Sequence, residues 1–146
     1  MEVASDHKVG WVEWVSLSDL SEDPIKAKVD TGAKTSALHA ENIRVKKLKN
    51  GRRQVSFTLF TSKNKKKGQR VTAPLLGSRV VKSSIGVATI RPVIRTTLKM
   101  GEHVQKVEVT LVNRQPMEYL MLVGRESLKG FAVHPDQKFL LGKSKP

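Results

Sequence analysis

The residues of this chain best suited to chemistry are Asp30, Thr31 and Gly32, a triplet that is followed by Ala33. A carboxylate presented at the end of a strand can move protons between a water molecule and a reacting group. Gly32 permits a tight turn and the close approach of another chain, and the Thr31 hydroxyl can hydrogen-bond across a neighbouring turn. Because all three residue types are common in turns, the triplet alone fits an Asx-type turn with an exposed carboxylate equally well.

Two apolar segments are expected to position this triplet. Ile25, Ala27 and Val29 alternate with polar residues and predict a half-buried strand that ends at Asp30. Far downstream, residues 119–123 predict a buried apolar strand, which is followed by Gly124 and a short helical turn.

Together the two segments resemble the two halves of the retroviral-type aspartic peptidase signature, in which an apolar strand ending in Gly-Arg passes beneath the catalytic loop and a short helix follows. Residues 25–38 and 119–134 carry the resemblance closely. Residues 79–84 and 91–94 are similar to a retropepsin-like family of bacteria and archaea. Its members are labelled ATP-dependent zinc proteases and are associated with ATP-grasp glutamate ligases.

The resemblance implies an all-β fold, a closed six-stranded acid protease barrel with one short C-terminal helix, in a single domain over residues 1–146. The chain has one Asp-Thr-Gly, so the second carboxylate must come from another copy of the chain. The expected enzyme is a homodimeric aspartic endopeptidase with Asp30 near the twofold axis. One Asp30 stays protonated and polarises the scissile carbonyl, while the other takes a proton from the attacking water.

The family pattern also assigns expected roles around the catalytic loop of Asp30, Thr31 and Gly32. Gly124 is expected to be structural, and the expected substrate-binding residues are Ala33, Lys34, Val81, Ser83, Ser84 and Arg125. Residues 76–86 are the favoured flap over the bound peptide, with the Lys-rich residues 62–68 as the alternative.

This chain departs from the family pattern at two places. The acidic residue that usually pairs with Arg125 is replaced by Lys34, so Arg125 is left to pair with Glu126 or Glu41 or to face the substrate. Thr35 and Ser36 replace a more apolar stretch and add hydroxyls near the site.

Neither zinc nor ATP is supported by a motif, so no cofactor and no metal are expected. The chain has no Cys, and its four His, at positions 7, 39, 103 and 134, lack the His-Glu-x-x-His spacing. His39 is expected to be a surface or loop residue beside the catalytic turn. A phosphate-binding Gly-x-x-x-x-Gly-Lys-Ser/Thr loop does not occur either.

Turn signals predict the remaining strands. Asn50-Gly51 predicts a hairpin between residues 43–48 and 53–59, and Gly101-Glu102 predicts one between residues 93–100 and 104–112. A strand is expected over residues 9–17. A closing hairpin is expected between residues 131–134 and 139–141.

The charge of +14, from 27 Lys plus Arg against 13 Asp plus Glu, indicates a polyanionic partner. The hairpin prediction places much of the excess positive charge at one edge, on Arg44, Lys46, Lys47, Lys49, Arg52, Arg53, Lys63, Lys65, Lys66, Lys67 and Arg70. Nucleic acid is the less favoured partner, because aromatic residues are only 5% of the chain and none is interleaved with these cations for base stacking. The association with glutamate ligases favours an acidic or Glu-rich protein substrate. The alternative is that these residues form a solvated basic face, which serves only to discourage edge-to-edge strand pairing.

A second class of function stays open from the sequence, a noncatalytic basic β-barrel domain that binds a polyanion or an acidic protein.

Charged residues interrupt every apolar run, so no membrane span is expected. Residues 1–20 lack the apolar core of a signal peptide and favour a cytoplasmic location, with a secreted or periplasmic one as the alternative for a trimmed chain.

Overall fold

The computed structural model describes residues 7–62, 68–82, 85–114 and 118–142. This part of the chain forms strands and a single turn of 3-10 helix, η1. The elements are β1 (Lys8–Gly10), β2 (Val12–Leu17), β3 (Ile25–Val29), β4 (Ser36–Lys47), β5 (Arg53–Leu59), β6 (Gln69–Pro74), β7 (Gly77–Lys82), β8 (Ala88–Met100), β9 (His103–Val112), β10 (Met121–Val123), η1 (Arg125–Ser127) and β11 (Ala132–His134).

Six strands close into a barrel in the order β10-β3-β2-β8-β9-β4, and pairing between β4 and β10 completes the ring. Two of the ring pairs, β10–β3 and β4–β9, are parallel, and the other four are antiparallel. The predicted all-β fold with a closed six-stranded barrel is therefore confirmed, and η1 is the predicted short C-terminal helix.

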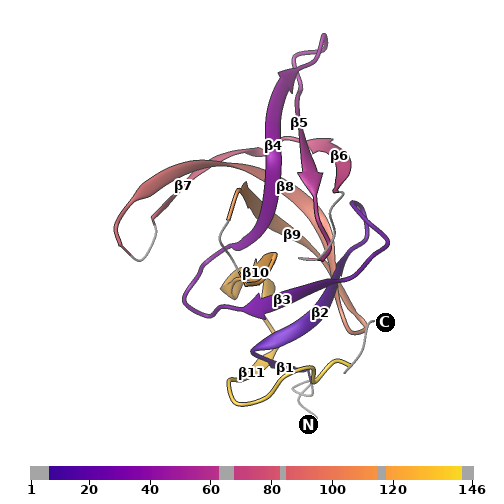
Figure 1. Cartoon of the computed structure of the whole chain (residues 1–146), viewed down its shortest axis with the longest axis vertical. Helices are drawn as coiled ribbons and strands as arrows, with labels where there is room; N and C mark the ends of the chain where they lie inside the picture. Colours follow the sequence, from indigo (N-terminus) through magenta and orange to yellow (C-terminus); the bar gives the residue numbers. More distant parts are fainter. Residues whose placement is uncertain (1–6, 63–67, 83–84, 115–117, 143–146) are drawn as a thin grey trace.

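The barrel carries two extensions, because β4 and β8 are 12 and 13 residues long and continue past it. β5 and β6 add to the far part of β4, and β7 pairs with the first part of β8. Figure 1 shows the β4–β5 hairpin rising from the barrel and the β7–β8 hairpin curving away on a different side.

The core lies inside the barrel and under the β5–β6 extension, and strand alternation builds it. In β3, Ile25, Ala27 and Val29 point inward while Lys26 and Lys28 are exposed. In β5, Val55, Phe57 and Leu59 are buried in the same way. Burial of alternate side chains fixes the register, since a shift by one residue would expose the whole apolar set.

Two of the three predicted hairpins form. Gly51 turns β4 into β5 with φ of 84°, and Gly101 turns β8 into β9 with φ of 62°. Positive φ is open to glycine without a steric penalty, which is why these two positions marked the turns in the sequence.

Two strand predictions need correction. The segment over residues 9–17 is two strands, β1 and β2, broken at Trp11. The hairpin between residues 131–134 and 139–141 was wrong, because β11 pairs in parallel with β1 and residues 139–141 form no strand.

The physical reason for the second error is a buried carboxylate. Glu13 is fully buried and accepts hydrogen bonds from the backbone N–H groups of Gly10, at 2.6 Å, Leu140, at 2.9 Å, and Leu141, at 3.1 Å. A side chain therefore supplies acceptors that a neighbouring strand would otherwise have provided.

Candidate active site

The loop that follows β3 is clamped by the segment that follows β10. The Asp30 N–H donates to the Val123 carbonyl at 2.9 Å. In the other direction, the N–H of Arg125 donates to the Ala33 carbonyl at 2.8 Å, and that of Glu126 to the Lys34 carbonyl at 3.0 Å. Backbone bonds on both flanks thus fix the loop between residues 30 and 34.

Gly124 has no room for a side chain at this crossing. A Cβ there would lie 2.5 Å from the carbonyl carbon and oxygen of Thr35 and 3.0 Å from the Ala33 oxygen. The structural role predicted for Gly124 therefore has a steric cause, which is the contact between two backbones.

Ser36 connects the start of β4 to the segment over residues 124–127. Its side chain is fully buried, and its Oγ accepts a hydrogen bond from the Gly124 N–H at 3.1 Å and lies 2.9 Å from the Ser127 Oγ. The Thr110 hydroxyl donates to the Ser36 carbonyl at 3.3 Å. The hydroxyl that departed from the family pattern in the sequence is thus part of the support of the loop.

Asp30 is half-buried and faces a cleft of about 680 Å³. Its Oδ1 accepts the Gly32 N–H at 2.9 Å, so the Asx-type turn considered from the sequence is present at the base of a cleft. The cleft is lined by Asp30, Gly32, Ala33, Lys34, Thr35, Ala37, Arg79, Val80, Val81, Lys82, Arg91, Thr110 and Leu122.

The β7–β8 hairpin forms one wall of this cleft, which places the favoured flap segment beside Asp30. Val80 and Ile90 are direct cross-strand partners, with 63% and 75% of their surfaces exposed. Val81, predicted to bind substrate, lines the cleft. Ser83 and Ser84 lie outside the described residues, as do residues 63–67 of the alternative flap.

Arg79 and Arg91 line the cleft, and Arg114 is close enough to Asp30 for its charge to be felt. Arg79 and Arg91 are cross-strand partners on the hairpin, and the Arg79 Nη2 lies 2.6 Å from the Glu108 Oε1. Burial lowers the pKa of Arg91. Burial also lowers the pKa of Arg114, as does the charge of Arg91, whereas the Asp30 carboxylate raises it.

These arginines retain unused hydrogen-bonding capacity. The Nη1 atoms of Arg79 and Arg114 are buried and have no hydrogen-bond partner within the described parts of the chain. Since an unpaired buried donor is costly, the arrangement is suited to a ligand that brings carboxylates or other acceptors.

Arg125 and Lys34 lie at the rim of the loop. The Arg125 Nη1 donates to the Thr31 carbonyl at 3.0 Å, so its partner is the Asp30 loop itself, not Glu41 or Glu126. Lys34 pairs with Glu126 at 3.8 Å between exposed side chains. Arg125 is not part of the cleft lining, and its contact with substrate stays a prediction.

The expectation for His39 was wrong. His39 is 1% exposed, its Nδ1 accepts the Arg114 N–H at 3.0 Å, and its Nε2 lies 2.7 Å from the Glu41 Oε2. The backbone donor fixes the tautomer, since the proton must sit on Nε2 and point at Glu41.

The residues present do not fit the zinc named in the family's label. In the described ranges, no three His, Cys, Asp or Glu side chains come close enough together to hold a metal ion. His7 and His103 have ring centroids 5.4 Å apart, and Phe131 packs against both rings. Imidazole and phenyl packing accounts for that pair.

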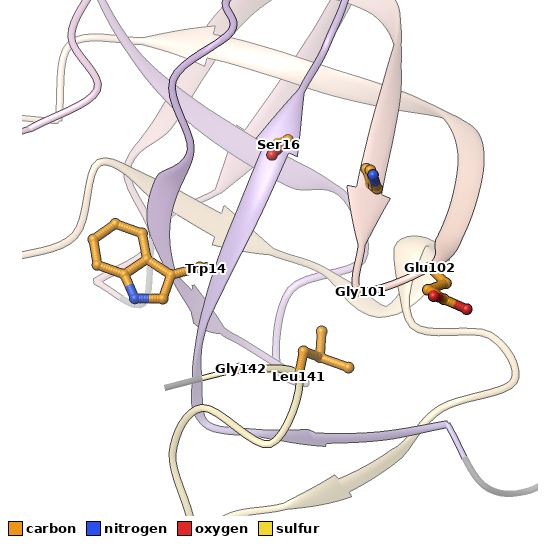
Figure 2. A pocket seen from close by; sticks show the side chains of 7 residues that line it. Trp14, Ser16, Gly101, Glu102, Leu141 and Gly142 are labelled. Carbon is orange, nitrogen blue, oxygen red and sulfur yellow. The ribbon is translucent and has the colours of Figure 1, made fainter. Parts of the chain in front are cut away.

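A second, smaller cavity of about 270 Å³ lies away from this site. Figure 2 shows Trp14 and Ser16 on β2, Gly101 and Glu102 at the β8–β9 turn, and Leu141 and Gly142 on the C-terminal segment around it. None of the predicted site residues lines it.

Sequence reasoning missed Arg79, Arg91 and Arg114 as site residues. One signal was available, because no Asp or Glu occurs between Glu41 and Glu102, and every charge in that stretch is positive. Arg79 and Arg91 reach the cleft of Asp30 through the cross-strand register of β7 and β8, which cannot be read from the sequence.

A six-stranded β-barrel with an Asp-Thr-Gly loop clamped by a Gly-Arg segment defines the retropepsin class of aspartic peptidase folds. Residues 8–144 match the family described as RimB-like, retropepsin-like aspartic endopeptidase RimB. The chain belongs to this RimB-like family.

Relatives and a solved structure agree with this assignment. The chain is 41% identical over 143 residues to a probable alpha-L-glutamate ligase of Shewanella halifaxensis, covering 95% of this chain and 31% of the relative. A protein of the same name from Parasynechococcus marenigrum is 41% identical over 136 residues, covering 92% of this chain and 29% of the relative. The chain thus spans about a third of the length of these relatives.

A crystal structure of a protein of unknown function (DUF785) from Legionella pneumophila superposes with a TM-score of 0.76 at 31% identity. The match covers 94% of this chain and 99% of that one.

No helix in the described residues is long and apolar enough to cross a membrane.

Proposed function

We propose that this chain is an aspartic endopeptidase that works as a symmetric homodimer and hydrolyses peptide bonds with a water activated by a shared Asp30 pair. The observation that carries the proposal is the placement of Asp30, half-buried in a cleft of about 680 Å³ at a loop held by backbone bonds from Val123 and Arg125. Each chain has one Asp-Thr-Gly, and the chemistry needs two carboxylates that share a proton.

In the proposed reaction, the protonated Asp30 donates to the scissile carbonyl oxygen while the ionised Asp30 removes a proton from the attacking water. The two carboxyls titrate as a pair, because close like charges cannot both ionise easily. The Gly32 N–H at Oδ1 and the Arg125 contact with the Thr31 carbonyl hold the loop in place during this exchange.

The proposed substrates are acidic or Glu-rich peptides. Lys34, Arg79, Lys82 and Arg91 line the cleft together with Asp30. Guanidinium groups bind carboxylates through paired hydrogen bonds, and the buried Nη1 of Arg79 has such a bond to offer. The curated relatives are named glutamate ligases, which fits a domain that acts on glutamate-containing chains.

The first test compares the wild type with Asp30→Ala on a peptide library that includes Glu-rich and uncharged members, across about pH 4 to 7, where a shared carboxylate pair should work. We expect the wild type to cleave and Asp30→Ala to lose all cleavage while keeping the same melting temperature. Cleavage retained in Asp30→Ala would overturn the proposal. A stable wild-type monomer with no cleavage would favour the noncatalytic basic domain.

The second test addresses the substrate class. For Arg91→Gln, we expect the KM for Glu-rich peptides to rise about tenfold, equivalent to about 1.4 kcal/mol, with little change for uncharged peptides. Lys26→Gln is the matched control, since it also removes one positive charge, from the exposed side of β3. Equal effects of the two variants would show that net charge, not the cleft, sets the preference.

A further inference from the structure

The β4–β5–β6 extension has a polar face that the peptidase proposal does not use. Side chains alternate across this sheet, and Val55, Phe57, Leu59, Val71 and Ala73 are all buried on one side. The opposite side, here called the outer face, carries Arg44, Lys46, Gln54, Ser56, Thr58, Arg70, Thr72 and Pro74, with Glu41 opposite Thr58.

The outer face is organised by register. Arg44 lies opposite Ser56, and Ser56 opposite Thr72, while Lys46 lies opposite Gln54. Arg44 and Lys46 are two residues apart on one strand, so their side chains leave the sheet about 6.6 Å apart. The result is a regular array of cations, hydroxyls and an amide.

Arg70 is fixed flat against this array. Its Nη1 donates to the Asn42 carbonyl at 2.7 Å and to the Thr58 hydroxyl at 3.2 Å, and its Nη2 donates to the Ser56 Oγ at 3.1 Å. The nearest carboxylate in register is Glu41, opposite Thr58, and its Oε2 is engaged by His39. Glu41 is the one acidic residue on β4, β5 and β6, so Arg44, Lys46 and Arg70 leave the array with a net positive charge.

We propose that the outer face docks on the phosphodiester backbone of a nucleic acid. Arg, Lys, Ser, Thr and Gln side chains are the groups that contact phosphates and sugars. A folded protein partner is disfavoured, because protein interfaces are anchored by apolar or aromatic side chains, and Pro74 is the one apolar residue that the outer face presents. The absence of stacking aromatics on this face means that binding reads the backbone and not the bases.

Fluorescence anisotropy tests the proposal with labelled duplex RNA, duplex DNA, single-stranded RNA and a poly-glutamate peptide, at salt from about 50 to 300 mM. The protein carries Asp30→Ala throughout, so that cleavage plays no part. We expect nucleic acid to bind at low salt. Arg44→Gln/Lys46→Gln should weaken it about tenfold and reduce the slope of log K against log salt by about 2.

The matched control is Lys26→Gln/Lys28→Gln, which removes the same charge from exposed positions of β3 on the barrel. This variant should keep the salt slope of the parent. Equal losses in both variants, no nucleic-acid binding at low salt, or poly-glutamate binding that alone depends on Arg44 and Lys46 would each overturn the proposal. The first result would mean unspecific attraction, and the last would mean an acidic protein partner.

Discussion

At the scale of single residues, the candidate site depends on backbone contacts so close that an added side chain would not fit. Gly124 shows this most clearly, because its backbone, with φ of −88° and ψ of 175°, is open to any residue. The requirement for glycine therefore comes from the neighbouring chain and not from the conformation of Gly124.

Gly124→Ala tests that statement. The added Cβ would meet the Thr35 carbonyl group at 2.5 Å, so we expect a loss of about 3 kcal/mol in the free energy of unfolding, at the upper end for overpacking. Urea denaturation measures it. Gly77→Ala is the control, since a Cβ at Gly77 meets nothing within 4 Å, and it should unfold like the wild type. If Gly124→Ala unfolded at the same urea concentration as the wild type, the close contact between Gly124 and the Thr35 carbonyl group would be contradicted.

Residue types and spacing were enough to find Asp30 and Gly124, because both belong to short local patterns. They were not enough for His39, whose burial depends on the Arg114 N–H, 75 residues away in the chain. The same limit applies to Arg79 and Arg91, which meet only through strand register. Contacts between distant segments are what local patterns leave undetermined.

At the scale of elements, the β7–β8 hairpin presents exposed apolar side chains beside the cleft. Val80→Ser should leave the melting temperature nearly unchanged, because Val80, which lines the cleft, is 63% exposed. The KM for peptide should rise about tenfold, since a bound peptide would cover part of this apolar surface. Steady-state kinetics with a peptide substrate measure this KM.

Val104→Ser is the control for that experiment, because Val104 is 57% exposed and is not part of the cleft lining. An unchanged KM in the hairpin variant, or an equal rise in the control, would remove the hairpin from substrate binding.

Asp19 links the turn after β2 to the middle of β8. Hydrogen bonds from the side chain and the backbone N–H of Thr97 lower the pKa of Asp19 below its ordinary value of 3.8, with Lys106 adding to the effect. A lowered pKa stabilises the fold at pH above the ordinary value, and the contribution is lost as the pH falls through the lowered pKa.

For Asp19→Asn we therefore expect a small loss of stability at pH 7, below about 1 kcal/mol because the site is exposed to solvent. The difference from wild type should shrink as the pH falls below 3.8. Thermal unfolding at several pH values measures it. A difference that stays constant with pH would mean that the Asp19 charge is not involved.

Alternation and turn glycines predicted most of the strands, since β3, β5 and the hairpins β4–β5 and β8–β9 follow local rules. The C-terminal segment did not follow them. Phe131 to Leu141 has the pattern of a hairpin, but Glu13 binds the backbone of Leu140 and Leu141 in place of a strand. A buried carboxylate in a distant strand cannot be inferred from the segment that it holds.

At the scale of the whole molecule, the proposed activity belongs to two chains. Mixing wild type with an equal amount of Asp30→Asn and allowing exchange should leave about half of the wild-type protomers paired with each other, by random pairing in a twofold dimer. Activity per wild-type chain should therefore fall to about half. Activity that is unchanged by mixing would contradict a shared site.

The hydrogen bonds between the Asp30 loop and residues 123–126 also determine when, during folding, this loop acquires its support. Arg125 and Thr31, which hydrogen-bond, are 94 residues apart, and barrel closure waits for β10 to pair with β3 and β4. Contacts at such separation form late, because loop closure must precede them. A nascent chain that still lacks residues 121–127 therefore has Asp30 without its support, so the proposed hydrolysis could begin only after these residues have been synthesised.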